Sequence, residues 1–171
     1  MISWQIDETL PAMRRLILLV LLLFSPLAQG AEGRVIKVLP QFLDKKGEAS
    51  LSPSLYERDA YQFYLRNHPR ERTALRLAVQ WKANDVGAGD LKLRAELRGL
   101  ESNTLHAVTI EQPVKKKGRF SHWSSIKVEG QNYKYLGPLV AWRVSLWENG
   151  QELGALESFL WSPVSPVSPS P

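Results

Sequence analysis

Apolar and polar side chains alternate with a period of two over most of the chain after residue 74. In the segment 75–81, every second side chain is apolar: Leu75, Leu77, Val79 and Trp81. The segment 91–98 repeats the pattern, with leucines and an alanine alternating with lysine, arginine and glutamate. Such alternation gives a strand one buried face and one solvated face, which is typical of an antiparallel sheet. We expect Trp81 to lie in the core.

The remaining strands are predicted at residues 34–39, 105–111, 120–128, 139–147 and 153–161. Turns or loops are predicted between strands, at residues 84–90, 113–118 and 129–132. Asn149-Gly150 separates the last two strands, and this dipeptide favours a two-residue hairpin turn. About seven short strands with turn signals between them predict a mainly β fold, an antiparallel sandwich of immunoglobulin-like or fibronectin-III-like architecture. The first strand, which ends before Pro40, is of the edge type.

One helix is predicted within this β pattern, at residues 53–66. Ser52 is expected to cap it, Pro53 occupies the first helical position, and Ser54 with Glu57 forms an S-x-x-E capping pattern. Four residues then share one helical face: Tyr56, Ala60, Phe63 and Tyr64. The helix should end near Asn67-His68-Pro69, because the residue before a proline is displaced from helical geometry.

The N-terminal region has the pattern of a secretory signal peptide. Arg14-Arg15 precedes the apolar run 16–24, and Ala28-Gln29-Gly30 supplies the small residues of a cleavage site between Gly30 and Ala31. A membrane-spanning helix needs about 20 apolar residues, so this run is too short to be an anchor. We therefore expect a periplasmic or secreted bacterial protein without stable membrane insertion after signal removal. Met1 and Met13 both remain possible start residues.

This interpretation divides the chain into three parts. Residues 1–30 form the extension and signal peptide, 31–161 form a single sandwich domain, and 162–171 form an extended, disordered tail rich in proline and serine. Prolines recur every third position from Pro163 to Pro169, which is the period of a polyproline II helix.

Residues for catalysis do not converge in the sequence. The chain contains no cysteine, which excludes thiol nucleophiles and thiolate metal sites. His68, His106 and His122 lack metal-ligand spacing, and there is no G-x-S-x-G motif. Ser121 and His122 are neighbours in a predicted strand, so their side chains should point to opposite faces. We expect no enzymatic activity, no cofactor and no metal.

Binding residues are easier to nominate, because the chain carries a net charge of +5. Lys115, Lys116, Lys117 and Arg119 lie in a predicted loop, where they can either contact an anion or simply keep the loop soluble. Trp123 and Trp147 fall on polar sheet faces and are candidate contact anchors. The alternative is that the helix covers these tryptophans through Tyr56, Phe63 and Tyr64. Trp142 is expected in the core.

Two stretches of the chain resemble other proteins. Leu51–Gln62, which reads LSPSLYERDAYQ, and Val79–Ala83, which reads VQWKA, look like segments of short exported bacterial proteins of uncharacterised function. The resemblance implies an envelope setting and carries no activity with it.

Two functions follow as hypotheses from these patterns. The first is a non-catalytic exported binding or assembly module of the bacterial envelope, with an envelope protein as partner. The alternative is a carbohydrate- or polyanion-binding protein that uses the basic loop and exposed tryptophans on an anionic glycan. Nucleic acid is not expected as a partner, because no groove-reading motif accompanies the charge.

Overall fold

The computed structural model describes residues 32–84 and 90–161. The predicted signal peptide, the predicted tail and part of the predicted loop at 84–90 lie outside these ranges. No helix in the described ranges is both long and apolar enough to cross a bilayer.

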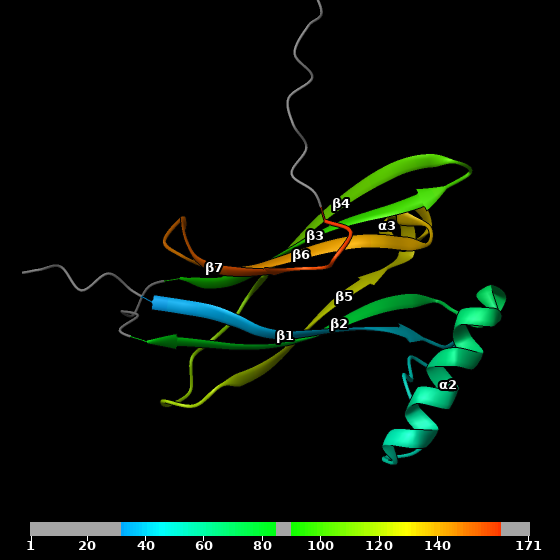
Figure 1. Cartoon of the computed structure of the whole chain (residues 1–171), viewed down its shortest axis with the longest axis horizontal. Helices are drawn as coiled ribbons and strands as arrows, with labels where there is room; N and C mark the ends of the chain where they lie inside the picture. Colours follow the sequence, from blue (N-terminus) through cyan, green and yellow to red (C-terminus); the bar gives the residue numbers. More distant parts are fainter. Residues whose placement is uncertain (1–31, 85–89, 162–171) are drawn as a thin grey trace, which may run out of the picture. The chain divides into compact units, whose positions relative to one another are not determined.

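In the described ranges the elements follow one another in this order: β1 (Glu32–Leu43), α2 (Leu55–Asn67), the 3-10 turn η1 (Pro69–Glu71), β2 (Ala74–Asn84), β3 (Leu91–Glu101), β4 (Thr104–Pro113), β5 (His122–Glu129), α3 (Gly130–Leu136), β6 (Leu139–Glu148) and β7 (Gln151–Glu157). The strands form two antiparallel sheets with the orders β1-β2-β5 and β4-β3-β6-β7. The sheets lie in two layers, as Figure 1 shows. The mainly β fold and the β-sandwich layering agree with the prediction.

The core lies between the sheets and follows the period-two pattern. Leu77, Val79 and Trp81 of β2 are fully buried, as are Leu93 of β3 and Leu146 of β6. The Trp81 indole N–H donates to the Ser124 hydroxyl over 2.9 Å, so its one polar group is satisfied. Trp142, expected in the core, is only partly buried and packs against the core's border.

One side of the sandwich is closed by glycines on its edge strands. A Cβ atom on Gly154 of β7 would overlap the carbonyl oxygen of Gly33 of β1. The two backbones can approach because neither residue has a side chain. β1 is an edge strand, as predicted, but it is longer than residues 34–39 and continues through Pro40. An edge strand tolerates proline because one of its sides has no ladder partner.

The last hairpin confirms the turn prediction. Asn149 and Gly150 have positive φ angles of 48° and 85°, and Glu148 pairs with Gln151 across the turn. The prediction that the last strand reaches Trp161 is wrong, because β7 ends at Glu157. Ser158 then exchanges backbone hydrogen bonds with other partners: it donates to the Trp142 carbonyl over 2.9 Å and accepts from the Trp161 N–H over 2.9 Å.

The structure also has a short helix that the sequence did not predict. Residues 129–132 were expected to form a turn, but α3 starts at Gly130 and continues to Leu136. Leu136 is fully buried and Tyr133 is half-buried against the core. These two residues, three positions apart, supply an inward face that is too short to give a periodic signal.

The predicted helix exists, but its orientation and start differ from the prediction. α2 begins at Leu55, and the Ser54 side chain makes no capping hydrogen bond. Its buried residues are Gln62 and Leu65. The Gln62 amide accepts from the Phe42 N–H (2.8 Å) and donates to the Phe42 carbonyl (2.9 Å). α2 is therefore attached to the end of β1 by a polar side chain.

The predicted aromatic stripe of α2 consequently points outward. Tyr56 is 83% exposed and Phe63 is 66% exposed. The helix packs on β1 and η1, at one end of the β1-β2-β5 sheet (Figure 1). The expectation that Tyr56, Phe63 and Tyr64 cover the sheet tryptophans is therefore wrong.

Candidate functional site

The outer face of the β1-β2-β5 sheet is lined with cationic side chains, which we call the basic face: Arg34, Lys37, Arg76, Lys82 and Lys127. The register brings them together across three strands. Arg34 lies opposite Lys82, and Arg76 lies opposite Lys127. They gather on one surface because alternate residues of β2 point into the core, and the remaining ones point out.

The charge of the basic face is largely uncompensated. Arg34, Lys37 and Lys82 form no ion pair with any residue in the described ranges. Arg76 donates two hydrogen bonds to the neutral Gln41 Oε1, at 3.1 and 2.8 Å, and so keeps its net charge. Lys127 is the exception, with the Glu129 carboxylate 2.5 Å from its ammonium group.

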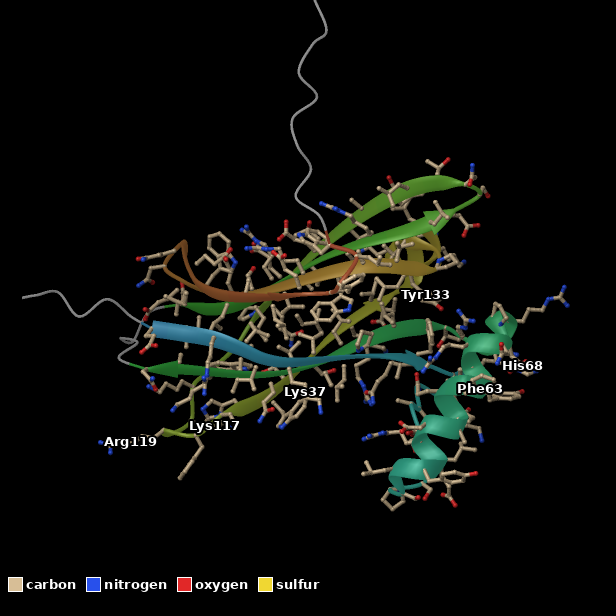
Figure 2. All side chains as sticks on the ribbon, viewed as in Figure 1. Lys37, Phe63, His68, Lys117, Arg119 and Tyr133 are labelled. Carbon is tan, nitrogen blue, oxygen red and sulfur yellow. The ribbon has the colours of Figure 1, made fainter. Side chains whose placement is uncertain are left out.

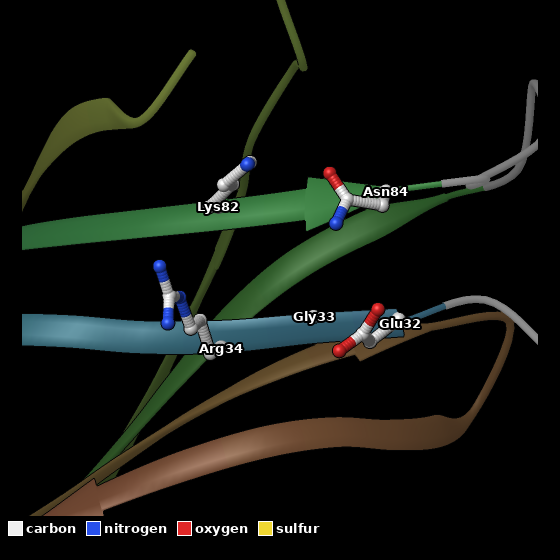
Figure 3. Close-up of a pocket in the computed structure, with 5 residues that line it drawn as sticks. All are labelled: Glu32, Gly33, Arg34, Lys82 and Asn84. Atoms are coloured by element: carbon white, nitrogen blue, oxygen red, sulfur yellow. The ribbon is translucent and has the colours of Figure 1, made fainter. Parts of the chain in front are cut away.

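One end of the basic face contains a shallow pocket of about 230 Å³. Its lining residues are Glu32, Gly33, Arg34, Lys82 and Asn84. Figure 3 shows the Arg34 and Lys82 side chains next to each other on β1 and β2. Two neighbouring cations with an amide beside them offer several N–H donors, and the Glu32 carboxylate in the same lining leaves the pocket with an excess of one positive charge.

The predicted basic loop, consisting of Lys115, Lys116, Lys117 and Arg119, does connect β4 to β5. Within the described ranges, none of its four cations forms an ion pair. The Lys117 backbone N–H donates to His122 Nε2 over 3.3 Å, which ties the loop to the start of β5. In Figure 2, Lys117 and Arg119 lie on the same side of the sheet as Lys37. The loop therefore enlarges the basic face.

Trp123 joins this surface from β5. Its register partner on β2 is Gln80, which in turn pairs with Lys37 of β1. Its side chain is 54% exposed. The Gln80 amide donates to the Ser121 hydroxyl over 3.0 Å, and this contact fixes the polar surroundings of the indole ring.

Trp147 does not belong to the same surface, because it lies on β6 of the other sheet. The Arg94 guanidinium lies over the Trp147 ring, 4.2 Å from its centroid. The Trp147 indole N–H donates to the Ser145 hydroxyl over 2.7 Å. Arg94 also pairs with Glu111 at 2.7 Å. Hydrogen bonds from Lys92 and Arg94 hold the pKa of Glu111 below its usual value.

The outer face of the β4-β3-β6-β7 sheet has a different charge pattern. Arg143 lies among three carboxylates, those of Glu96 (3.0 Å), Glu152 (2.7 Å) and Glu157 (2.9 Å). Desolvation lowers the pKa of Arg143, but the hydrogen bonds that its guanidinium donates to Glu152, Glu96 and Glu157 outweigh this effect, and the pKa is raised. Here acids and bases neutralise one another, whereas the basic face has an excess of cations.

Ser121 and His122, which are neighbours in the sequence, point to opposite faces of the sheet at the start of β5, as expected. The Ser121 hydroxyl contacts Gln80 on the outer face, while the His122 ring lies 5.0 Å from the Trp81 ring toward the core. In the ranges 32–84 and 90–161, no group of three or more histidine or carboxylate side chains is arranged so that it could hold a metal ion.

The strand cations of the basic face were missed by the sequence reasoning, which identified only the loop. A signal was present, because the outward positions of β2 include Arg76, Gln80 and Lys82 without an acid. However, β1 and β5 had first to be placed beside β2, and no local pattern specifies this pairing.

Comparisons with known proteins add no relative to this description: no family model matches the chain, and no curated protein or solved structure is significantly similar to it.

Proposed function

We propose that this protein is an exported, non-catalytic binding module of the bacterial envelope that captures a linear polyanion on its basic face. The observation that carries the proposal is the contrast between the two sheets. Arg34, Lys37 and Lys82 have no acidic partner in the described ranges, while Arg143 on the opposite face is surrounded by acids. Uncompensated charge on one face attracts and orients a polyanion.

The setting and the finer fold belong to the same proposal. The pattern of residues 13–30 supports export. The strand orders β1-β2-β5 and β4-β3-β6-β7 support an immunoglobulin-like sandwich of the fibronectin-III-like type, because β4 pairs with β3 and not with β5. Such sandwiches commonly serve as binding modules, but the basic face, not the fold, carries the functional argument.

The test is a binding titration of the purified protein with fluorescently labelled polyanions: polygalacturonate, dextran sulfate and polyphosphate. We expect at least one of them to bind at low salt and to dissociate in about 1 M NaCl, where the screening length is about 3 Å. The Lys37→Gln/Lys82→Gln variant should weaken binding about tenfold, since two exposed charges contribute somewhat less than about 1 kcal/mol each.

The matched control is Arg66→Gln/Lys134→Gln, which removes two charges at exposed positions outside the basic face. This control should change the affinity by less than about twofold. Equal weakening by both variants would show that net charge acts without a defined surface, and the proposal would then be rejected. The absence of binding to all three polymers would reject it as well.

Assembly with a protein partner is the second candidate, and the outward face of α2 is the observation that favours it. Leu55 and Tyr56 are 65% and 83% exposed, and Phe63 is 66% exposed. Large apolar side chains gathered in this way are common at protein interfaces. Recovery of one stoichiometric envelope protein by the native chain, but not by Tyr56→Ser/Phe63→Ser, would support assembly. Equal recovery by both would count against it.

A further inference from the structure

Trp123 is the only exposed tryptophan in the described ranges, and its ring has no stacking partner there. Trp81 is fully buried, while the rings of Trp147 and Trp161 lie beneath the guanidinium groups of Arg94 and Arg98. Trp142 is partly buried against the core. An aromatic ring that is left uncovered while most of its counterparts are covered is suited to receive a ligand.

The immediate neighbours of Trp123 on the sheet are polar and uncharged. Gln80 lies opposite it, and Ser125 shares its face two residues along β5. Ser125 pairs with Ala78, and both side chains are small, so they project less from the sheet than the Trp123 ring does. The ring therefore stands beside a shallow neutral strip that offers amide and hydroxyl groups.

Cations lie on both sides of this neutral strip. Lys82 and Arg34 lie toward one end of the strands, and Arg76 and Lys127 lie toward the other. Lys82 and Arg76 are six positions apart on β2, which is about 20 Å in an extended strand. Lys37 lies two strands from Trp123 in the same row, about 10 Å away.

Along the basic face, cations are followed by an uncovered indole ring and then by more cations. This order of groups matches an acidic glycan better than the other polyanions. A pyranose ring presents a face of C–H groups that packs on an indole and a rim of hydroxyl groups that reach amides. A polyphosphate chain has no ring to place on Trp123. α2 and the basic loop both extend from the same side of the sheet as the basic face (Figure 1). A flat bilayer would therefore contact them before it reached the strands that carry the ring.

We infer that the ligand of the basic face is an acidic polysaccharide, with one sugar ring stacked on Trp123 and its carboxylate or sulfate groups paired with Lys37 and Lys82. This inference rests on the proposed polyanion binding and specifies its ligand. The neutral strip receives the uncharged part of the polymer, and the cations on either side hold its acidic groups.

The experiment measures the affinity of the purified protein for four probes. These are polygalacturonate, which carries carboxylates, dextran sulfate, which carries sulfates, polyphosphate, and vesicles of phosphatidylglycerol. Each is titrated against the native chain, Trp123→Ala and Trp123→Phe. Phe159→Ala is the matched control, because Phe159 is a fully exposed aromatic residue outside the basic face.

We expect one of the two polysaccharides to bind more tightly than polyphosphate or the vesicles. Trp123→Ala should weaken that polysaccharide at least about tenfold, the size of a single aromatic hot spot. Trp123→Phe should restore part of the loss, while Phe159→Ala has no effect. Polyphosphate binding should change by less than about twofold with Trp123→Ala, since charge alone holds it.

The outcomes separate this inference from the proposed function. If polyphosphate or vesicles bind as tightly as the polysaccharides, or if Trp123→Ala leaves polysaccharide affinity unchanged, the glycan assignment is overturned while polyanion binding stands. If no probe binds, the proposed function itself fails, and the inference fails with it. Selection between polygalacturonate and dextran sulfate identifies the acidic group.

Discussion

The backbone carbonyl of Leu136 occupies the space directly above Gly99. A Cβ atom on Gly99 would overlap the carbonyl oxygen and would also approach the Leu136 side chain at 3.0 Å. This contact joins the last residue of α3 to β3, close to the strand's C-terminal end. α3 can pack this closely on β3 only because Gly99 has no side chain.

The first prediction concerns this contact. Gly99→Ala should destabilise the fold by about 3 kcal/mol, because the obstacle is backbone and cannot rotate away. Urea unfolding measures the loss. The matched variant is Gly150→Ala, where nothing lies within 4 Å and only the positive φ of 85° is strained. The free energy of unfolding of that variant should fall by about 1 kcal/mol. Equal losses in the two variants would show that a small backbone shift removes the overlap with Leu136.

The second prediction concerns the attachment of α2. Gln62→Met keeps the volume but leaves the Phe42 N–H and carbonyl, and the Ala49 carbonyl, without their partner. Unpaired groups of this kind cost about 1 kcal/mol or more each, so we expect a loss of about 3 kcal/mol. Limited proteolysis should cut α2 faster in the variant. Gln131→Met, at an exposed site, is the control, and similar behaviour of the two variants would contradict the anchoring role.

The third prediction concerns the pH dependence that Asp44 and Tyr61 create. The Tyr61 hydroxyl donates to the Asp44 carboxylate over 2.7 Å. This bond lowers the pKa of Asp44, which backbone N–H groups also stabilise, and it raises the pKa of Tyr61 to about 12. The contribution of Asp44 is therefore present above its unfolded pKa of about 4 and is lost as the pH falls through its folded pKa. That of Tyr61 is complete below its unfolded pKa of about 10 and is lost as the pH rises through about 12.

Tyr61→Phe tests this pair. At about pH 7 it should cost about 1–2 kcal/mol, and at about pH 3 the cost should shrink as Asp44 protonates and ceases to be a charged acceptor. Urea unfolding at the two pH values gives both numbers. A cost that is independent of pH would mean that the hydroxyl contributes only packing.

The fourth prediction concerns the acid cluster around Arg143, whose side chain is 21% exposed. Arg143→Met should leave Glu96, Glu152 and Glu157 without their shared cation and reduce the unfolding free energy by about 2 kcal/mol. Because the three glutamates are partly solvated, about 1 M NaCl should shrink the loss. Arg66→Met, at an exposed position of α2, should have little effect at either salt concentration, and a salt-independent loss in Arg143→Met would indicate lost packing instead.

Local patterns predicted most of the fold. Alternation and runs of β-branched residues located the seven strands of the described ranges, and alternation also predicted the buried side of β2, which includes Trp81. Asn149-Gly150 located the last hairpin, because few other residue pairs accept positive φ at both positions. These features depend on residues that are close in the sequence, so a single chain suffices to recognise them.

The face of α2 and the existence of α3 were not predictable in the same way. The period of α2 identified an aromatic stripe, but a periodic stripe does not reveal whether anything lies opposite it. Gln62 contacts a strand twenty positions away in the sequence, and this contact turned the stripe outward. α3 spans only seven residues, and its position depends on Gly99.

The sequence by itself determined the approximate positions of the strands, the buried face of β2 and β3, and that the β4–β5 loop is basic. Only the tertiary structure decided that Lys37, Lys82 and Trp123 share one surface and that Trp147 lies on the other sheet. The physical reason is that alternation specifies a strand's two faces but not its neighbours. Strand pairing is set by contacts between residues that are distant in the sequence, and the outward side chains of paired strands meet only as a result.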